Sequence, residues 1–184
     1  MSRGRLIAVV GPSGVGKDTL MRAMVAARPG LRRVQRVITR PADAQGEGHE
    51  AVSEAEFAAR LREGGFALHW RAHGLRYGVP VGITIDLAMG RDLLVNLSRG
   101  ALSEAQARFE PFAVLHLVAA RELLATRLAA RGREAGADMA ERLEGADMAL
   151  PEGVGPVVQL DTDAPVERLA RRALKALYPA RGRR

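Results

Sequence analysis

Apolar runs alternate with helical stretches along the chain, and this alternation predicts the fold class. Residues 6–10 form an uninterrupted apolar run that ends at Gly11, as expected of a strand buried on both faces of a parallel sheet. Similar strands are predicted at residues 33–38, 92–97, 112–118 and 157–160. Helical spacing of apolar residues predicts helices at residues 18–27, 83–89, 102–109, 121–130, 138–149 and 165–177. We therefore expect an α/β fold with a parallel five-stranded core sheet flanked by helices.

A different pattern occupies residues 36–80. Residues 39–50 are polar, contain proline and glycine and lack periodicity, which predicts a loop. Ser53 and Glu56 have the spacing of a capping box, which predicts a helix that ends near Glu63. Residues 66–80 predict two short strands with a turn at His73 and Gly74. We interpret this segment as a small subdomain inserted into the core.

The residues that follow the first strand have the pattern of a phosphate-binding loop. The sequence GPSGVGKDT matches G-x-x-x-x-G-K-[ST] except at its last position, where Asp18 stands and Thr19 follows. A glycine loop between a buried strand and a helix lets several backbone N–H groups and the helix dipole point at one phosphate chain. The candidate nucleotide-binding residues are Gly11, Pro12, Ser13, Gly14, Val15, Gly16, Lys17, Asp18 and Thr19. An ordinary glycine-rich turn is the alternative interpretation.

Lys17 is the candidate catalytic residue of this loop. The chain contains only two lysines, Lys17 and Lys175, against 26 arginines, so a lysine kept here indicates a chemical requirement. Its ammonium group can reach the outer phosphates of a nucleotide as a point charge. We expect ATP and Mg²⁺ as cofactors, with Asp18 or Thr19 contacting the metal, because Mg²⁺ prefers hard oxygen ligands. Alternatively, Asp18 is only a favourable charge in the first helical turn.

Charged and aromatic residues of the insertion are candidates for binding a second, anionic substrate. Arg36 and Arg40 can hold a phosphate by forked hydrogen bonds, and the hairpin at residues 66–80 concentrates the only Trp and two of the four His. Polar residues after the strand at 92–97 share the sheet edge of the glycine loop. The candidate substrate-binding residues are Arg36, Arg40, His73, Arg76, Tyr77, Asn96 and Ser98. The alternatives are that the arginines are solvated and that Trp70 and Tyr77 pack a small core.

Further arginines follow the strand at 112–118. Arg127 and Arg131 share a helix face by their spacing, and Arg133 follows two residues later. We predict a helical lid at about 126–149, in which Arg127, Arg131 and Arg133 act as catalytic residues that close over the transferring group. The alternative is a solvated helical hairpin. We expect one domain over residues 1–184, with its core at about 1–35, 81–125 and 150–180 and the insertion at about 36–80. His116, within a core strand, is expected to be a core histidine with its hydrogen bonds satisfied.

Composition narrows the classes of function. The net charge is +7 and 47% of residues are apolar, which allows a sizeable core and favours anionic partners. One Trp, two Tyr and four Phe are too few for a base-stacking surface, so nucleic acid binding is suggested by charge alone. The absence of cysteine, of a long apolar run and of a leader segment predicts a cytoplasmic protein without a membrane partner. The oligomeric state stays open, with a homodimer as one alternative.

Together these motifs resemble the guanylate kinase branch of the P-loop kinases over nearly the whole chain. The resemblance includes residues 11–19, 38–40, 46–48, 53–57 and 77–78, and the arginines from 127 to 142. Guanylate kinases have a second phosphate-binding arginine where this chain has Asp43, and a tyrosine near His49. Their guanine-reading acid falls near Leu68 or His69, and their acidic strand end is replaced by Asn96 and Ser98. These departures indicate that GMP is a poor substrate.

A second resemblance is longer. The chain resembles the ribose 1,5-bisphosphate phosphokinase family of phosphonate catabolism at residues 16–18 (Gly-Lys-Asp), 36–41, 69–75, 77–78 and 95–99. This resemblance implies transfer of the γ-phosphoryl group of ATP to ribose 1,5-bisphosphate, giving 5-phosphoribosyl 1-diphosphate and ADP. The acceptor already contains an ionised phosphate oxygen, so catalysis should depend on positioning and charge neutralisation. A nucleoside monophosphate kinase and a non-catalytic guanylate kinase-like interaction module remain as alternatives.

Overall fold

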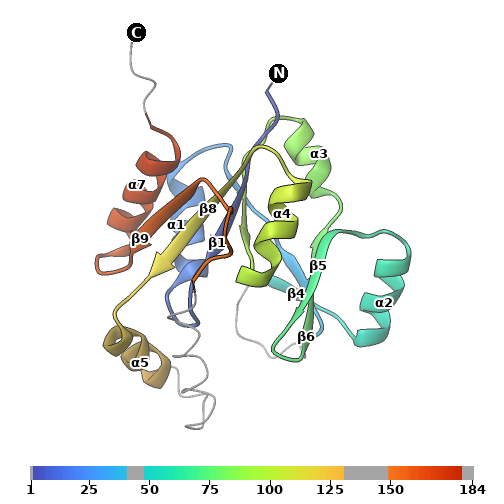
Figure 1. The fold of residues 1–184 in the computed structure, drawn as a ribbon, viewed down its shortest axis with the longest axis horizontal. Coiled ribbons are helices and arrows are strands. Elements are labelled where there is room, and N and C mark those ends of the chain that lie inside the picture. The colour runs from blue at the N-terminus through green and yellow to red at the C-terminus, as the bar shows by residue number, and fades with distance from the viewer. Residues whose placement is uncertain (1, 41–47, 131–148, 180–184) are drawn as a thin grey trace.

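Five parallel strands form the core sheet of the protein (Figure 1). The structure is a computed structural model and describes residues 2–40, 48–130 and 149–179. The strands of the core sheet are β1 (Leu6–Val10), β2 (Arg32–Arg33), β7 (Leu93–Asn96), β8 (Phe112–Val118) and β9 (Val157–Asp161). Their order is β2-β7-β1-β8-β9, and each neighbouring pair is parallel. The predicted α/β fold with a five-stranded parallel sheet is confirmed.

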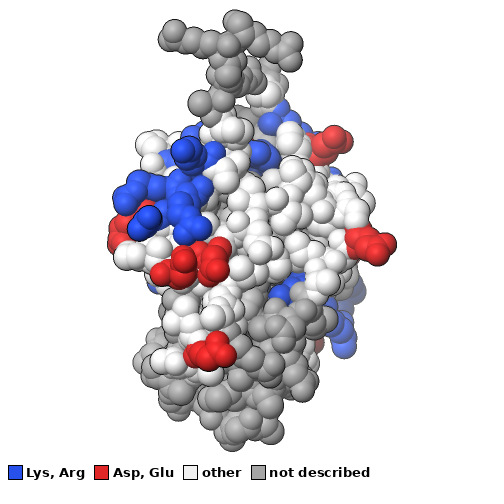
Figure 2. Space-filling view, turned by 60° about the vertical axis from the view of Figure 1, so that its left-hand side comes forward, with Lys and Arg blue, Asp and Glu red and all other residues white. Residues whose placement is uncertain are grey.

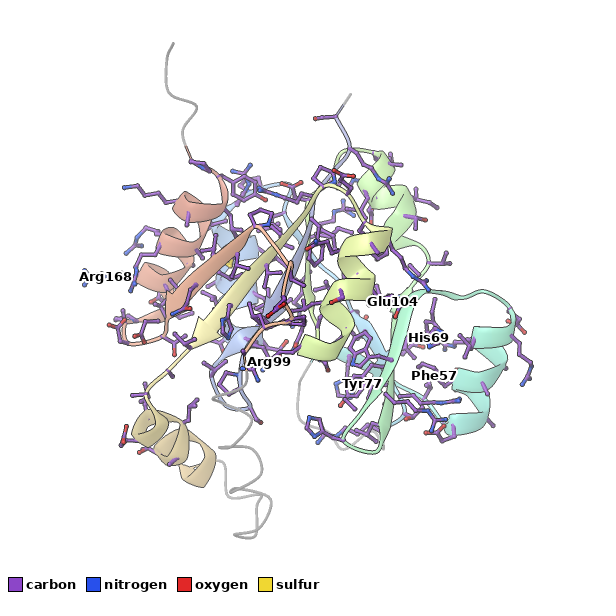
Figure 3. The ribbon with its side chains drawn as sticks, viewed as in Figure 1. Phe57, His69, Tyr77, Arg99, Glu104 and Arg168 are labelled. Carbon is purple, nitrogen blue, oxygen red and sulfur yellow. The ribbon has the colours of Figure 1, made fainter. Side chains whose placement is uncertain are left out.

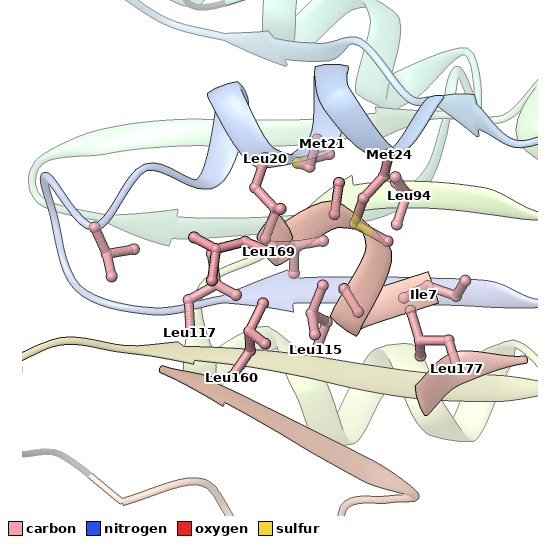
Figure 4. Packing of buried hydrophobic residues seen from close by; sticks show 14 of the residues in the cluster. Ile7, Leu20, Met21, Met24, Leu94, Leu115, Leu117, Leu160, Leu169 and Leu177 are labelled. Atoms are coloured by element: carbon pink, nitrogen blue, oxygen red, sulfur yellow. The ribbon is translucent and has the colours of Figure 1, made fainter. Parts of the chain in front are cut away.

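Helices cover both faces of this sheet because each strand sends alternate apolar side chains to opposite sides. On β1, Ile7 and Val9 pack with α1 (Lys17–Ala27) and α7 (Val166–Leu177), as Figure 4 shows for part of this cluster. Leu6, Ala8 and Val10 point to the other face, toward α3 (Ile83–Ala88), the short helix η1 (Arg99–Ala101) and α4 (Leu102–Arg108). All five β1 residues are buried, so the strand before the glycine loop has a fixed position.

A second, smaller sheet lies beside the core sheet, on the right in Figure 1. Its order is β4-β3-β6-β5, and its strands are β3 (Arg36–Ile38), β4 (His49–Ala51), β5 (Phe66–Ala72) and β6 (Leu75–Pro80). Helix α2 (Glu54–Arg62) packs on it through Phe57, whose ring stacks on Phe66 with 4.5 Å between centroids. The predicted hairpin is confirmed, with its turn at His73 and Gly74, both at positive φ.

Two predictions for residues 33–50 are wrong. The strand expected at 33–38 is two strands in different sheets, since β2 pairs with β7 whereas β3 pairs with β6. Val34 still donates its N–H to Leu94 O at 2.8 Å, and the chain then leaves the core sheet. The loop expected at 39–50 contains the start of β4, which pairs parallel with β3. Both errors concern pairings between distant residues, which local periodicity does not record.

The other predicted elements agree with the structure within one or two residues. Helix α5 (Arg121–Ala130) follows β8 and lies beyond the end of that strand in Figure 1. Ser53 caps α2 as predicted, since its Oγ accepts the Glu56 N–H at 3.1 Å. The helix predicted at 138–149 lies outside the described residues except for residue 149. Among the helices described, none is long and apolar enough to span a membrane.

The exposed face of α7 is strongly basic. Figure 2, in which the left side of Figure 1 comes forward, shows basic side chains gathered in one area with acidic ones beside them. Arg168, Arg171, Arg172 and Lys175 are exposed on this helix, and Arg172 pairs with Asp163 at 3.3 Å. The opposite stripe of α7, which contains Leu169, Ala173 and Leu177, is buried in the core. The positive charge of this helix therefore lies on a solvated surface.

Candidate active site

The glycine loop lies where the strand order of the core sheet reverses. From β1 the sheet continues through β7 and β2 on one side and through β8 and β9 on the other. Ligands of open parallel sheets bind at the carboxyl ends of the strands, at this point of reversal. Asn96 at the end of β7 pairs with Val9, and Val10 pairs with His116 of β8. The ends of three strands therefore surround the loop that begins at Gly11.

The backbone of the loop has the shape of an anion cradle. Gly11 has φ 153°, and a Cβ there would lie 2.6 Å from the Leu117 carbonyl oxygen, so the close approach of β8 requires glycine. Gly16, at φ 99° and ψ 25°, precedes α1 in the left-handed region, and a Cβ there would meet nothing within 4 Å. No side chain caps α1, as expected of a helix start that binds a phosphate.

Lys17 is folded back over this loop. Its Nζ donates to the carbonyl oxygens of Gly11 and Pro12, at 2.8 and 2.9 Å. These bonds hold the ammonium group at the mouth of the cradle and also fix the loop. A positive charge held in place before the ligand arrives needs little reorganisation to bind a phosphate.

Asp18 and Thr19 begin the first turn of α1. The side chain of Asp18 is one-quarter exposed, with Oδ1 3.4 Å from Nη1 of Arg33, and Thr19 is exposed. In the described part of the chain no group of three or more His, Asp or Glu side chains could hold a metal ion. Mg²⁺ does not need such a group, since it commonly keeps several waters and takes one or two carboxylates with substrate phosphates. The residues present therefore fit a phosphate-bound Mg²⁺.

Several predicted substrate-binding residues meet between the two sheets. Trp70 Nε1 donates a hydrogen bond to Ser98 Oγ at 2.8 Å, which joins the hairpin to the segment that follows β7. Tyr77 stacks on Trp70 with 5.3 Å between ring centroids, and the guanidinium of Arg36 lies 5.5 Å from the Tyr77 ring. Trp70 also packs against the core cluster under α4. Figure 3 labels Tyr77, on the side of the small sheet, and Arg99, on the side of the core sheet.

Other predicted residues point elsewhere. Arg76 directs its side chain to the α2 face of the small sheet, where its Nε is 3.6 Å from Glu54 Oε2, because neighbouring residues of a strand alternate in direction. His73 is exposed at the hairpin turn. Arg40 lines a pocket of about 470 Å³ together with Thr39, Ser53, Glu54 and Glu56. This pocket combines a cation with carboxylates, which suits a ligand that has both phosphate and hydroxyl groups.

The predicted lid residues are only partly described. Arg127 belongs to the last turn of α5. Arg131 and Arg133 lie outside the described residues, as do residues 131–148 of the predicted lid.

Two residues at the same sheet edge were not singled out from the sequence as functional. Arg99 directly follows Ser98, and His116 lies on β8 beside the end of β1. The prediction that His116 has its hydrogen bonds satisfied is wrong, since its Nε2 is buried with no hydrogen-bond partner among the described residues. Burial, and then the positive charge of Arg99, lowers the pKa of His116. The position of Arg99 after a strand end was a usable signal, whereas the position of His116 within a strand favoured a core role.

A larger pocket, of about 720 Å³, lies at the opposite edge of the sheet. It is lined by residues at the start of β1 and β8 and by the turn before β9, among them Arg5, Phe112 and Pro156. Among the described residues that line it, none belongs to a glycine loop between a strand and a helix like that of residues 11–16. Size alone therefore does not identify the site, and we place it at the carboxyl edge.

Comparison with known structures identifies the fold. No protein-family model matches the chain. Guanylate kinase from Anaplasma phagocytophilum superposes with a TM-score of 0.63 at 16% identity, over 96% of this chain and 84% of that protein. A gluconokinase from Sinorhizobium meliloti 1021 gives a TM-score of 0.55 at 21% identity, over 96% of this chain and 93% of that one. Fold and glycine loop together define a P-loop kinase of the guanylate kinase-like class.

Sequence relatives narrow the class to a family. The chain is 51% identical to ribose 1,5-bisphosphate phosphokinase PhnN of Ruegeria sp. (strain TM1040), over 87% of this chain and 84% of the relative. It is 45% identical to the PhnN of Pseudomonas fluorescens (strain SBW25), over 95% of both chains. A bifunctional ribose 1,5-bisphosphokinase-thymidine phosphorylase of Cupriavidus necator matches at 43% identity, with 95% of this chain covering 29% of that protein. The chain belongs to the ribose 1,5-bisphosphate phosphokinase (PhnN) family.

Proposed function

We propose that this protein transfers the γ-phosphoryl group of ATP to the 1-phosphate of ribose 1,5-bisphosphate. An oxygen of the 1-phosphate forms the new bond to the γ-phosphorus, and the bond from that phosphorus to the β–γ bridging oxygen breaks. The products are 5-phosphoribosyl 1-diphosphate and ADP. The observation that supports this most is the intact glycine loop with Lys17 held over it, in a chain of this family.

The residues of the loop would bind the ATP phosphates. Backbone N–H groups between Gly14 and Lys17 would face the phosphate chain, and the Lys17 ammonium would neutralise charge that develops on the transferring group. Mg²⁺, held by the phosphates with Asp18 or Thr19, would supply further charge neutralisation. No strong general base is needed, because the attacking oxygen is already ionised.

The insertion at about 36–80 would bind the acceptor. Arg36 and Arg40 are its candidate phosphate contacts, and Tyr77 and Ser98 would define the wall between the two sheets. Arg99 adds a cation at the same edge, next to His116, which is kept neutral by its lowered pKa. His73, Arg76 and Asn96 stay as predicted contacts. The segment at about 126–149 would close over the site, with Arg127, Arg131 and Arg133 on the transferring group.

A guanylate kinase activity is the second candidate, and only the fold favours it. Where guanylate kinases are expected to read the base with a carboxylate, this chain has Leu68, which is fully buried, and His69, which is exposed on β5. A buried leucine cannot accept hydrogen bonds from a guanine edge. The structure therefore gives GMP no equivalent of that contact at these two positions.

One assay separates these functions. Purified protein with Mg-ATP is offered ribose 1,5-bisphosphate, GMP or gluconate, and ADP release is followed while phosphorus NMR identifies the product. We expect turnover with ribose 1,5-bisphosphate, a diphosphate signal in the product and loss of turnover when Mg²⁺ is chelated. Rapid turnover with GMP and none with the sugar bisphosphate would replace our proposal with a nucleoside monophosphate kinase.

A further inference from the structure

The departure of this loop from its usual pattern has a structural counterpart. Where a hydroxyl residue commonly follows the loop lysine, this chain has Asp18, and its carboxylate faces Arg33. Arg33 Nη1 lies 3.4 Å from Asp18 Oδ1, at the outer limit of a hydrogen bond, and each side chain is one-quarter exposed. The pair therefore joins the first turn of α1 to the edge strand β2.

The guanidinium of Arg33 also lies against the small sheet. A Cβ added to Gly48 would stand 2.0 Å from Nη2 and 2.5 Å from Cζ of Arg33. Gly48 directly precedes β4, and β4 pairs with β3 so that His49 stands opposite Arg36. The guanidinium of Arg33 thus lies between Asp18, on the side proposed to bind the nucleotide, and Gly48, which directly precedes β4.

Strand β4 in turn contributes to the acceptor side. Ala51, its last residue, and Val52 form part of the wall of the pocket that Arg40 lines. A shift of β4 would therefore change this pocket and the surroundings of Arg36. Electrostatics favour the same arrangement, because a carboxylate beside bound phosphates is unfavourable unless a cation stands next to it.

We propose that Asp18 and Arg33 form a positioning contact that holds β4, and with it the acceptor pocket, in register with the glycine loop. Arg33 is a positioning residue in this arrangement, and a side chain at Gly48 would displace its guanidinium. The effect on catalysis rests on the proposed function, whereas the contact itself does not.

Three variants test the contact, with a matched control on the same strand. Arg33→Met removes the charge, and Gly48→Ala displaces the guanidinium without changing any charge. Arg32→Met is the control, since Arg32 is the neighbouring residue of β2, more than half exposed, and its nearest acidic partner is Asp86 of α3, at 3.9 Å. Asp18→Asn, alone and combined with Arg33→Met, completes a double-mutant cycle.

We expect Arg33→Met to raise the KM for ribose 1,5-bisphosphate about fivefold, as for one partly exposed ion pair, with the KM for ATP changed less than about twofold. Gly48→Ala should raise the acceptor KM in the same direction by about twofold to threefold, and Arg32→Met should leave it unchanged. The effects of Asp18→Asn and Arg33→Met on the acceptor KM should be strongly non-additive, because each change alone breaks the same contact. Equal acceptor KM values for Arg33→Met and Arg32→Met, or additive effects in the cycle, would overturn the proposal.

A second measurement keeps the test independent of the reaction. Amide hydrogen exchange at residues 48–52 should be faster in Arg33→Met and Gly48→Ala than in the wild type or Arg32→Met. Unchanged exchange in both variants would contradict the contact even in an active enzyme. If the wild type does not phosphorylate ribose 1,5-bisphosphate, the proposed function fails, and the exchange result still decides the contact. A role of Asp18 in metal binding alone would instead change the Mg²⁺ requirement of Asp18→Asn and leave exchange unaltered.

Discussion

The two edges of the core sheet use polar groups in opposite ways. At the amino edge, Asp92 accepts the Arg5 N–H at 2.7 Å with one oxygen and the Tyr178 hydroxyl at 2.6 Å with the other. Arg28 and Arg5 stack over the Tyr178 ring, at 3.6 and 4.7 Å from its centroid. Burial, and then the bond to Asp92, raises the pKa of Tyr178. These groups satisfy one another, and they fasten the end of α7 to the starts of β1 and β7.

At the carboxyl edge, by contrast, we infer that polar groups are placed to bind a ligand. Helix α1 begins there without a side-chain cap, Gly16 faces open space, and His116 Nε2 is buried without a hydrogen-bond partner in the described residues. Buried polar groups are normally paired, so groups left this way at one edge indicate ligand binding. We therefore assign stability to the amino edge and the proposed function to the carboxyl edge, although the larger of the two pockets lies at the amino edge.

The largest expected effect is on Lys17. We expect Lys17→Ala to lower kcat by about 100-fold or more, as for the loss of one preorganised charge-stabilising donor. The thermal midpoint of unfolding should change little, because Lys17 lies at the mouth of the loop and is not part of the core. Lys175→Ala, a change at the only other lysine, is the control, and steady-state kinetics with calorimetry measure both. A Lys17→Ala enzyme with near-normal kcat would contradict the assignment of function to the carboxyl edge.

An intermediate effect is expected from the opposite edge. Asp92→Ala leaves the Arg5 N–H and the Tyr178 hydroxyl without their acceptor, so we expect a loss of about 2 kcal/mol in the free energy of unfolding. Tyr178→Phe removes one of the two bonds and should cost about 1 kcal/mol. Urea unfolding measures both values, and kcat of each folded variant should stay within about twofold of the wild type, because the edge is remote from the loop. A tenfold loss of kcat in folded Asp92→Ala would show that the edges are not separate.

The smallest effect concerns His116 and pH. Its pKa is lowered in the folded protein, so the unfolded chain takes up a proton first as the pH falls below about 6.5. The contribution to stability is therefore complete above that pH and is lost as the pH falls through the folded-state pKa. His116→Gln should show a shallower fall of the unfolding free energy between pH 7 and pH 5 than the wild type. Parallel curves of unfolding free energy against pH for His116→Gln and the wild type would show that the histidine is not held neutral.

The sequence predicted those parts of the fold whose signal is local. The apolar run of β1, the capping box at Ser53 and the turn at His73 each depend on neighbouring residues, and all three are confirmed. The division of residues 33–38 between two sheets was missed because it depends on pairing with β7 and β6, whose partner residues are 39 or more positions away. The sequence also suggested one shared site for Arg76 and Tyr77, although alternation along β6 sends their side chains to opposite faces.

The same limit applies to the candidate site. The glycine loop could be found because its residues are consecutive and its chemistry depends on the backbone. The contact of Arg33 with Asp18, the bond of Trp70 to Ser98 and the burial of His116 each join elements that are distant along the chain. Residue type indicated that cations gather around the site, and only the structure shows which face each one occupies.

The bond from Trp70 to Ser98 has a practical consequence. This indole is the only one in the chain, and it lies at the junction of the sheet that holds the glycine loop and the sheet proposed to hold the acceptor. Its fluorescence is therefore an intrinsic reporter for that junction. A titration with either substrate can follow changes there in the unlabelled protein, with no background from a second tryptophan.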